Sequence, residues 1–241
     1  MLQAVGIALL VAVSVCVTPR VCAGSPTTTI YGHSVDGRPL LAYTFGHGPN
    51  TTAILFCIHG NERNTRPLGE RLIRYLEAHQ DAYAGCTVTV LPCVNPDGWA
   101  NDTRVNAHSV DLNRNFPVGW KPSDLQHLKR GTKPLSEPES AALARLILAL
   151  KPSKIISVHN PLHLLDYTGA PGLALAKLIA SHDGYPIPKN GVGYPTPGSL
   201  GQFCGKLGIA IVTLELPRES VDDAWDQNIG ACLAAIKWKP S

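Results

Sequence analysis

The chain has 241 residues, of which 44% are hydrophobic and 16% charged, the composition of a globular protein with a sizeable core. Its 21 Lys and Arg residues against 18 Asp and Glu residues give a net charge of only +3, and the basic residues are scattered along the sequence. Because no basic stripe with interleaved aromatic residues occurs, the sequence argues against nucleic acid as a partner.

The first 23 residues differ from the rest. An uncharged apolar run at 5–17 is followed by small residues at the positions that precede a signal-peptidase cleavage site after Ala23. The sequence therefore predicts a cleaved signal peptide at 1–23 and a single domain at 24–241. The run is shorter than the roughly 20 apolar residues of a comfortable span. We thus expect a periplasmic or secreted protein without a stable membrane span, with a retained anchor or a misassigned start as alternatives.

Five cysteines remain if the signal is removed, so at least one thiol must be free. Cys86 and Cys93 bracket one predicted strand and would lie about 23 Å apart if it is extended. A disulfide tolerates Cα atoms only about 7 Å apart, so these two are not expected to bond to each other. The sequence leaves any other pairing open.

Strand-like and helix-like segments alternate along the mature chain. Continuous apolar runs rich in β-branched residues predict strands, and apolar residues at helical spacing predict helices. Ser136 with Glu139 forms a possible capping box, and Ser220 is a possible helix N-cap. In chain order we expect a strand at 51–58, a helix at 66–79, a strand at 86–94, a helix at 136–150, strands at 154–158 and 209–216, and a helix at 220–238.

Buried strands that alternate with helices indicate an α/β fold: a mixed, mostly parallel sheet with helices on both faces. In such sheets ligands bind beyond the carboxyl ends of the strands. Three predicted strands end in titratable side chains there. His59 and Glu62 follow the first strand, His159 ends another, and Glu215 lies at the end of the last.

These strand ends suggest a metal centre. Buried titratable groups are costly unless they are paired or bind a metal, and two histidines with one glutamate are a known zinc ligand set that leaves a position open for water. We therefore predict one zinc ion per chain, bound by His59, Glu62 and His159. His163 is the main competitor for the third position, but His159 comes directly off the strand.

Hydrolysis of an amide at such a centre needs a group that accepts and returns a proton. Glu215 closes an apolar strand, and burial raises the pKa of a carboxyl group toward the useful range. Glu215 is therefore the predicted general base and acid. Glu219, four residues later, is the less favoured alternative.

The segment 102–117 is dense in Asn and Arg. Asn113 and Arg114 can offer an amide and a forked guanidinium to a substrate carboxylate, and Arg104 can stabilise an oxyanion beside the metal. An ordered loop tied by its own side chains is the structural alternative. We assign Asn106, Asp111 and Asn115 to that scaffold.

Taken together, these residues resemble the zinc carboxypeptidase family, for which the His₂Glu set is a known example. The resemblance runs from about Thr51 to Pro217 and rests on an ordered series of segments. These are HGNE, NPDGW, TRVNAHSVDLNRNFP, SVHNPLH, GYPTPGSLG and TLELP. HxxE alone is a weak signal, whereas the ordered set is specific.

Within that family the sequence looks most like the murein peptide amidase branch, which cleaves the γ-D-glutamyl–meso-diaminopimelate bond of cell-wall peptides. The resemblance implies the same three zinc ligands and Glu215 as base. It also implies that Arg104 polarises the carbonyl, that Asn113 and Arg114 clamp the terminal carboxylate, and that Tyr194 lies on a loop that closes over the substrate. Peptidoglycan stem peptides or muropeptides are then the expected substrates.

The predicted signal peptide at 1–23 departs from that branch, because its members recycle wall fragments in the cytoplasm and need no export signal.

Two other functions compete with a wall-peptide amidase. One is a zinc deacylase of the aspartoacylase or succinylglutamate desuccinylase type, which acts on N-acyl amino acids and carries a similar ligand pair. The other is a wall-binding relative that has lost catalysis, which the presence of all three ligands and the base disfavours.

Overall fold

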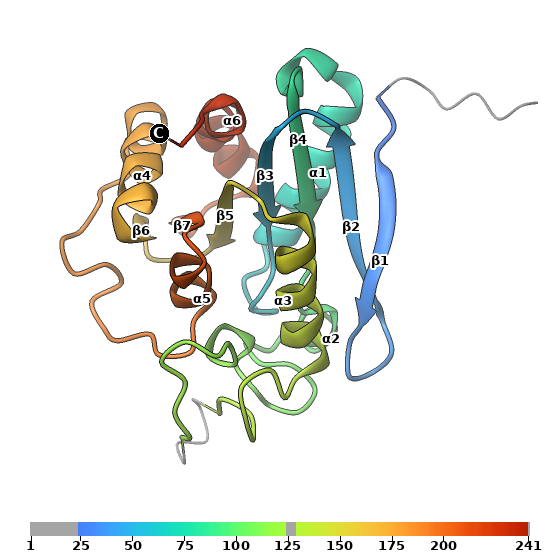
Figure 1. Ribbon diagram of the computed structural model, residues 1–241, viewed down its shortest axis with the longest axis vertical. Coiled ribbons are helices and arrows are strands. Elements are labelled where there is room, and N and C mark those ends of the chain that lie inside the picture. Colours follow the sequence, from blue (N-terminus) through green and yellow to red (C-terminus); the bar gives the residue numbers. More distant parts are fainter. Residues whose placement is uncertain (1–23, 124–128, 241) are drawn as a thin grey trace, which may run out of the picture.

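In the computed structural model, residues 24–123 and 129–240 are described, and the predicted signal segment 1–23 lies outside them. They form one seven-stranded sheet in the order β1-β2-β4-β3-β5-β7-β6, with helices on both faces (Figure 1). The strands are β1 Thr27–His33, β2 Pro39–Gly46, β3 Asn50–Leu55, β4 Cys86–Leu91, β5 Lys154–His159, β6 Leu164–Thr168 and β7 Ala210–Glu215. The helices are α1 Thr65–Ala78, α2 Pro96–Asn101, α3 Pro138–Leu150, α4 Gly169–Asp183, α5 Leu200–Lys206 and α6 Val221–Lys237. Two 3₁₀ turns, η1 Gln80–Tyr83 and η2 Leu112–Arg114, complete the elements.

The four central strands β4, β3, β5 and β7 run parallel, while β1, β2 and β6 add antiparallel strands at the two edges. The predicted α/β fold is therefore confirmed, with its parallel part in the middle. In the parallel part β5 pairs with both β3 and β7, so the carboxyl ends of β3, β5 and β7 lie side by side. This edge is where the sequence placed the candidate site residues.

Alternate residues of the central strands contribute to two separate hydrophobic cores, one on each face of the sheet. Ile54, Val90 and Val212 face a core with α1, α4 and α6, whereas Leu55 and Ile211 face a second core with α3 and α5 (Figure 1). Strands that are apolar on both faces are typical of a sheet covered on both sides. The two covered faces hold the central strands rigidly, and with them the site at their ends.

Several local predictions can now be compared with the structure. Ser220 does cap α6, because its side chain accepts a hydrogen bond from the backbone N–H of Asp223. The predicted capping box of Ser136 and Glu139 is wrong: Glu137 is the N-cap of α3 and makes no side-chain cap bond. Ser136 instead donates to the Glu137 carboxylate at 2.7 Å. Among the described residues no helix is long and apolar enough to traverse a bilayer.

All five cysteines of the described residues are free, so Cys86 and Cys93 do not bond to each other, as expected. The sulfur atoms of Cys93 and Cys57 lie 3.3 Å apart as thiols in hydrogen-bond contact. Cys57, Cys86 and Cys204 are buried and pack as small apolar side chains, the usual state of a free cysteine in a core.

Candidate active site

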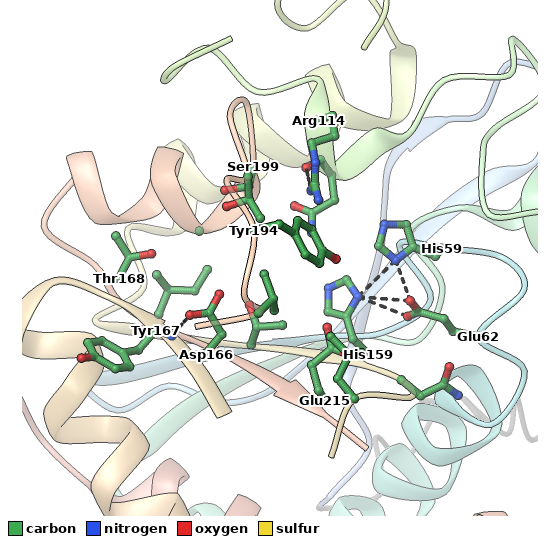
Figure 2. A pocket seen from close by; sticks show the side chains of 18 of the residues that line it. His59, Glu62, Arg114, His159, Asp166, Tyr167, Thr168, Tyr194, Ser199 and Glu215 are labelled. Carbon is green, nitrogen blue, oxygen red and sulfur yellow. Dashed lines mark hydrogen bonds and ion pairs between the residues drawn. The ribbon is translucent and has the colours of Figure 1, made fainter. Parts of the chain in front are cut away.

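The three predicted metal ligands meet at the carboxyl edge of the sheet. His59 and Glu62 lie in the loop after β3, and His159 is the last residue of β5. All three side chains are buried, and one ligand atom from each lies within 4.8 Å of the others. His163, the competitor, is exposed, and its ring contacts that of Tyr185 instead. His59, Glu62 and His159 thus lie together in the structure, as the sequence predicts (Figure 2).

A glycine lies between the first two ligands, where the backbone passes very close to another segment. At Gly60 a Cβ atom would stand only 1.9 Å from the backbone carbon of Gly98, at the start of α2. Such a distance is impossible for a real side chain, so only glycine allows the two backbones to approach here. This close contact fixes the loop that carries His59 and Glu62.

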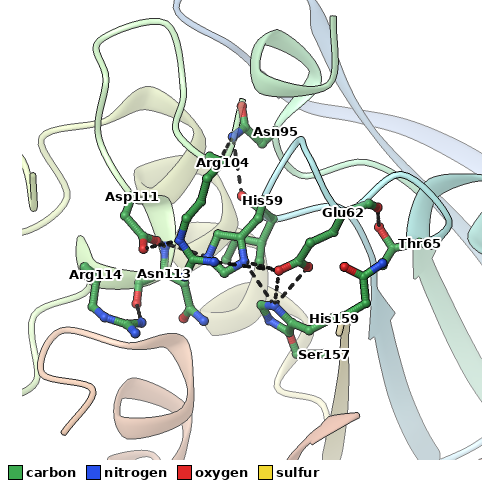
Figure 3. A network of polar contacts seen from close by, with 12 residues as sticks. His59, Glu62, Thr65, Asn95, Arg104, Asp111, Asn113, Arg114, Ser157 and His159 are labelled. Carbon is green, nitrogen blue, oxygen red and sulfur yellow. Dashed lines mark hydrogen bonds and ion pairs between the residues drawn. The ribbon is translucent and has the colours of Figure 1, made fainter. Parts of the chain in front are cut away.

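The hydrogen bonds of the two histidines direct one nitrogen of each ring at Glu62 (Figure 3). Nε2 of His59 lies 3.2 Å from the Asp111 carboxylate, and Nε2 of His159 lies 3.1 Å from the Ser157 hydroxyl. When Nε2 carries the proton and donates it to these acceptors, Nδ1 of each ring has a bare lone pair. The two Nδ1 atoms are 3.2 Å apart and lie 2.7 Å and 3.2 Å from the Glu62 carboxylate oxygens.

The charges of the site reinforce one another. Burial by itself opposes ionisation of Glu62, but His59 and His159 outweigh it and lower the pKa of Glu62 to about 2. Burial likewise disfavours a charged His59, yet the carboxylates of Glu62 and Asp111 raise its pKa. Asp111 is also buried, and His59 and Arg104 hold its pKa far below the usual range. The cluster therefore keeps both carboxylates ionised and attracts positive charge.

These residues fit a zinc ion. Two imidazole lone pairs and one ionised carboxylate point at a common position, and lone pairs that face each other at short range need a cation between them. The remaining ring nitrogens are held by a carboxylate and a hydroxyl, the outer contacts that orient histidine ligands of zinc. His59, Glu62 and His159 would hold the ion. When bound, zinc acidifies water and polarises a carbonyl group.

Glu215, the predicted base, ends β7 directly beside His159, with which it pairs in the β5–β7 register. Its carboxylate lines the same cavity as the metal ligands and is 7% exposed, and its Oε2 atom accepts no hydrogen bond. Burial raises the pKa of Glu215. A carboxylate with one free oxygen and a raised pKa can take a proton from water and release it again. Its role stays a prediction, and its position supports it.

The two predicted arginines and Asn113 line the same cavity, which has a volume of about 250 Å³. Arg104 reaches the centre, with its Nε donating to Asp111 at 3.1 Å and NH1 3.8 Å from Glu62. Arg114 is buried, and its NH1 donates to the backbone carbonyl of Asn113 at 2.6 Å. The Asn113 side chain accepts from the backbone N–H of Leu200, which leaves its NH₂ group to donate elsewhere.

Tyr194 lies in the segment between α4 and α5, is 53% exposed and lines the cavity. Figure 2 shows its ring reaching over the cavity between Arg114 and His159. An exposed tyrosine on an irregular segment is suited to contact a substrate, although its closing movement stays a prediction.

Two contributing residues were not assigned to the site from the sequence. Asp111 was assigned to a loop scaffold, yet its carboxylate joins His59 to Arg104. At Ser157 the sequence indicates only a strand, yet the hydroxyl group of this residue orients His159. Ser157 precedes the ligand by two residues, so both side chains project from the same face of β5, a spacing that could have revealed it. For Asp111 only the fold brings the contact about, 52 residues from its partner.

An α/β sheet that ends in a zinc-type ligand set, with a further carboxylate and two guanidinium groups in the same cavity, is typical of a metal-dependent hydrolase. Residues 24–168 match the family model described as zinc carboxypeptidase. The chain therefore belongs to the zinc carboxypeptidase family and is a metallohydrolase.

Three comparisons place the chain further. It is similar to murein peptide amidase A of Escherichia coli strain K12, with 32% identity over 92% of this chain and 95% of the relative. The crystal structure of murein-tripeptide amidase from Escherichia coli O157 matches with a TM-score of 0.74 and 31% identity, over 93% of this chain and 98% of that one. An aspartoacylase family protein from Mesorhizobium loti matches with a TM-score of 0.62 at 19% identity, over 90% of this chain and 68% of that one, which shows a shared fold alone.

Proposed function

We propose that the enzyme hydrolyses the γ-D-glutamyl–meso-diaminopimelate amide bond of peptidoglycan-derived peptides with one zinc ion per chain. The observation that carries this proposal is the 32% identity to murein peptide amidase A, which extends over nearly the whole length of both chains. The site is compatible with it, because a metal-type ligand set, a proton-accepting carboxylate and a carboxylate-binding guanidinium line one cavity.

In this proposal each of the residues that line the cavity has a separate task. Arg114 and the NH₂ group of Asn113 bind the terminal carboxylate of the diaminopimelate residue, which orients the scissile amide. Glu215 takes a proton from the attacking water and delivers it to the leaving amine. Arg104 donates to the carbonyl oxygen as negative charge develops there. Tyr194 covers the bound peptide.

The place of action is a second part of the proposal. The apolar run at 5–17 supports export, in which case the mature enzyme would act on stem peptides or released muropeptides outside the cytoplasm. Expression of the full chain in a bacterial host, followed by mass spectrometry of the purified protein, tests this. We expect a mature N-terminus at Gly24, and a full-length protein retained in the cytoplasm would contradict export.

The activity is tested with the defined tripeptide L-Ala-γ-D-Glu-meso-diaminopimelate. We expect mass spectrometry to detect the dipeptide and free diaminopimelate as the products, with the activity lost in a strong chelator and restored by zinc. Intact substrate after prolonged incubation with zinc-loaded enzyme would contradict the proposal, and so would cleavage at the L-Ala–D-Glu bond.

N-acyl amino acids serve as the control substrates, because a deacylase of the aspartoacylase type would prefer them. We expect their hydrolysis to be much slower than that of the tripeptide. A wall-binding protein without catalysis would cleave neither substrate, whether or not zinc is present.

A further inference from the structure

The cavity extends beyond the metal centre along strand β7. Its floor is lined by Glu215, Thr213 and Ile211, which alternate along β7 and project from the same face. The antiparallel neighbour β6 adds Asp166 and Thr168 to the lining, and Asp166 pairs with Thr213 in the register. Figure 2 shows Asp166 on the opposite side of the cavity from His59 and Glu62.

Asp166 is the acidic residue of this extension, and its carboxylate has no basic side chain as an ion-pair partner among the described residues. Its Oδ1 atom accepts one hydrogen bond, 2.9 Å from the backbone N–H of Tyr167. Within residues 24–123 and 129–240 it forms no ion pair with any Lys, Arg or His side chain. Burial raises the pKa of Asp166, a sign that its charge is poorly solvated. A carboxylate in this state is a strong acceptor for a cation that enters the cavity.

A loop covers this carboxylate. Gly191, in the segment that leads to Tyr194, has φ +55°, and a Cβ atom there would lie 2.4 Å from Oδ1 of Asp166. The backbone of Gly191 thus lies close to the carboxylate, and its positive φ favours glycine at this position. The contact connects the half-buried Asp166 to the segment that carries Tyr194.

The spacing along the sheet matches the length of one substrate side chain. Asp166 pairs with Thr213, two residues before Glu215, and two residues of a strand span about 7 Å. In diaminopimelate four carbon–carbon bonds, about 5 Å in all, separate the centre next to the scissile amide from the distal centre, and its amino nitrogen adds about 1.5 Å. An amide held beside Glu215 would thus place the distal amino group near Asp166.

We propose that Asp166 binds the distal ammonium group of the diaminopimelate residue and so selects it over amino acids without a distal amine. This inference rests on the proposed function and deepens it. Thr213 pairs with Asp166 across the ladder, and Thr168 lies two residues further along β6. Both line the cavity, and their hydroxyl groups can donate to the distal carboxylate of the same centre. A zwitterionic side-chain end would thus find an acceptor and donors side by side.

The test uses three tripeptides that differ only in the last residue: meso-diaminopimelate, L-lysine and 2-aminopimelate. Lysine keeps the distal ammonium without the carboxylate, whereas 2-aminopimelate keeps the distal carboxylate without the ammonium. For Asp166→Asn we expect kcat/KM to fall roughly 10- to 100-fold with the first two peptides, mainly through KM, because a charge-assisted hydrogen bond is lost. With 2-aminopimelate we expect kcat/KM to stay within about twofold of wild type or to rise.

Two further variants and a zinc measurement complete the test. Asp166→Glu keeps the charge and should recover part of the activity on diaminopimelate. Asp226→Asn removes an exposed carboxylate on α6 and should leave all three rates unchanged. Zinc content and the thermal unfolding midpoint of each variant show whether the fold and the metal centre are intact.

The outcomes separate the inference from the proposed function. Equal losses on all three peptides, or no loss on diaminopimelate, would overturn the role of Asp166 while the wild-type rates uphold the amidase. A wild-type enzyme that cleaves none of the peptides would overturn the proposed function, and the inference with it. If Asp166→Asn does not fold, Asp166→Glu and the substrate preference of the wild type decide. The inference then requires the wild type to cleave both ammonium-bearing peptides faster than the 2-aminopimelate peptide, and the absence of this preference overturns it.

Discussion

Replacement of Asp111 by Asn tests how the metal centre is built. The Asp111 carboxylate is buried, with Oδ1 3.2 Å from Nε2 of His59 and Oδ2 accepting from Nε of Arg104 at 3.1 Å. Oδ1 also accepts from the backbone N–H of Asn113 at 2.9 Å. Since both oxygens face donors, an asparagine of the same shape must turn its NH₂ group toward one of them. Facing His59, that group would favour the tautomer with the proton on Nδ1, the nitrogen that the metal needs.

The expected loss follows from the contacts of the carboxylate. Loss of such an outer contact of a histidine ligand typically weakens metal binding 10- to 100-fold, which corresponds to about 1.4–2.8 kcal/mol. We expect Asp111→Asn to fall in this range, because the strongly lowered pKa of Asp111 reflects its interactions with His59 and Arg104. Ser157→Ala is the matched control on the other histidine. It removes a neutral acceptor, so we expect a loss of less than about tenfold.

Competition with a chromogenic chelator of known zinc affinity measures both variants against wild type. Thermal unfolding of the metal-free proteins, run in parallel, reports any general damage to the fold. The reasoning about tautomer control is wrong if Asp111→Asn binds zinc as tightly as wild type. It is also wrong if Ser157→Ala loses more zinc affinity than Asp111→Asn does.

Three other predictions follow from the same site. Glu215→Gln should retain zinc while kcat falls roughly 10²- to 10⁴-fold, as measured on the tripeptide, and a rate within threefold of wild type would remove Glu215 from the mechanism. Arg114→Lys keeps the charge but loses the guanidinium fork, so kcat/KM should fall roughly tenfold or more for a peptide with a free terminal carboxylate and hardly change for its amide; equal losses on both would refute the clamp. The pKa of Glu62 is lowered from 4.5 to about 2, so its ionised form stabilises the metal-free fold above the ordinary pKa, and this contribution disappears as the pH falls from about 4.5 toward 2. Urea unfolding should therefore show a steeper loss of stability over this range for wild type than for Glu62→Gln, and parallel curves would contradict the lowered pKa.

Much of the site could be predicted because its residues lie at the ends of strands with clear apolar patterns. His59, His159 and Glu215 each follow or end such a run, and neighbouring parallel strands bring their carboxyl ends together. The apolar pattern of β3, β5 and β7 was therefore sufficient to predict both the fold class and the ligand set. It also favoured His159 over His163, which the structure places in contact with Tyr185.

What could not be predicted depends on contacts between distant segments. The edge strands β1 and β2 were not foreseen, because a partly exposed strand lacks the continuous apolar run of the central ones. The capping box at Ser136 failed because tertiary contacts took its partner: the Glu139 carboxylate accepts from the backbone of Val35 and from Asn106. The scaffold role predicted for Asp111 is confirmed, because its Oδ1 atom accepts from the backbone N–H of Asn113. Its second role beside His59 could not be predicted, since only the fold brings these two residues together.

The central claim is that His59, Glu62 and His159 share one zinc ion. Anomalous diffraction at the zinc absorption edge from crystals of the zinc-loaded enzyme tests it most directly. We predict a single strong peak about 2.0–2.2 Å from Nδ1 of each histidine and from a carboxylate oxygen of Glu62, absent from crystals of His159→Ala. A peak elsewhere, or none in protein that cleaves the tripeptide, would contradict the account.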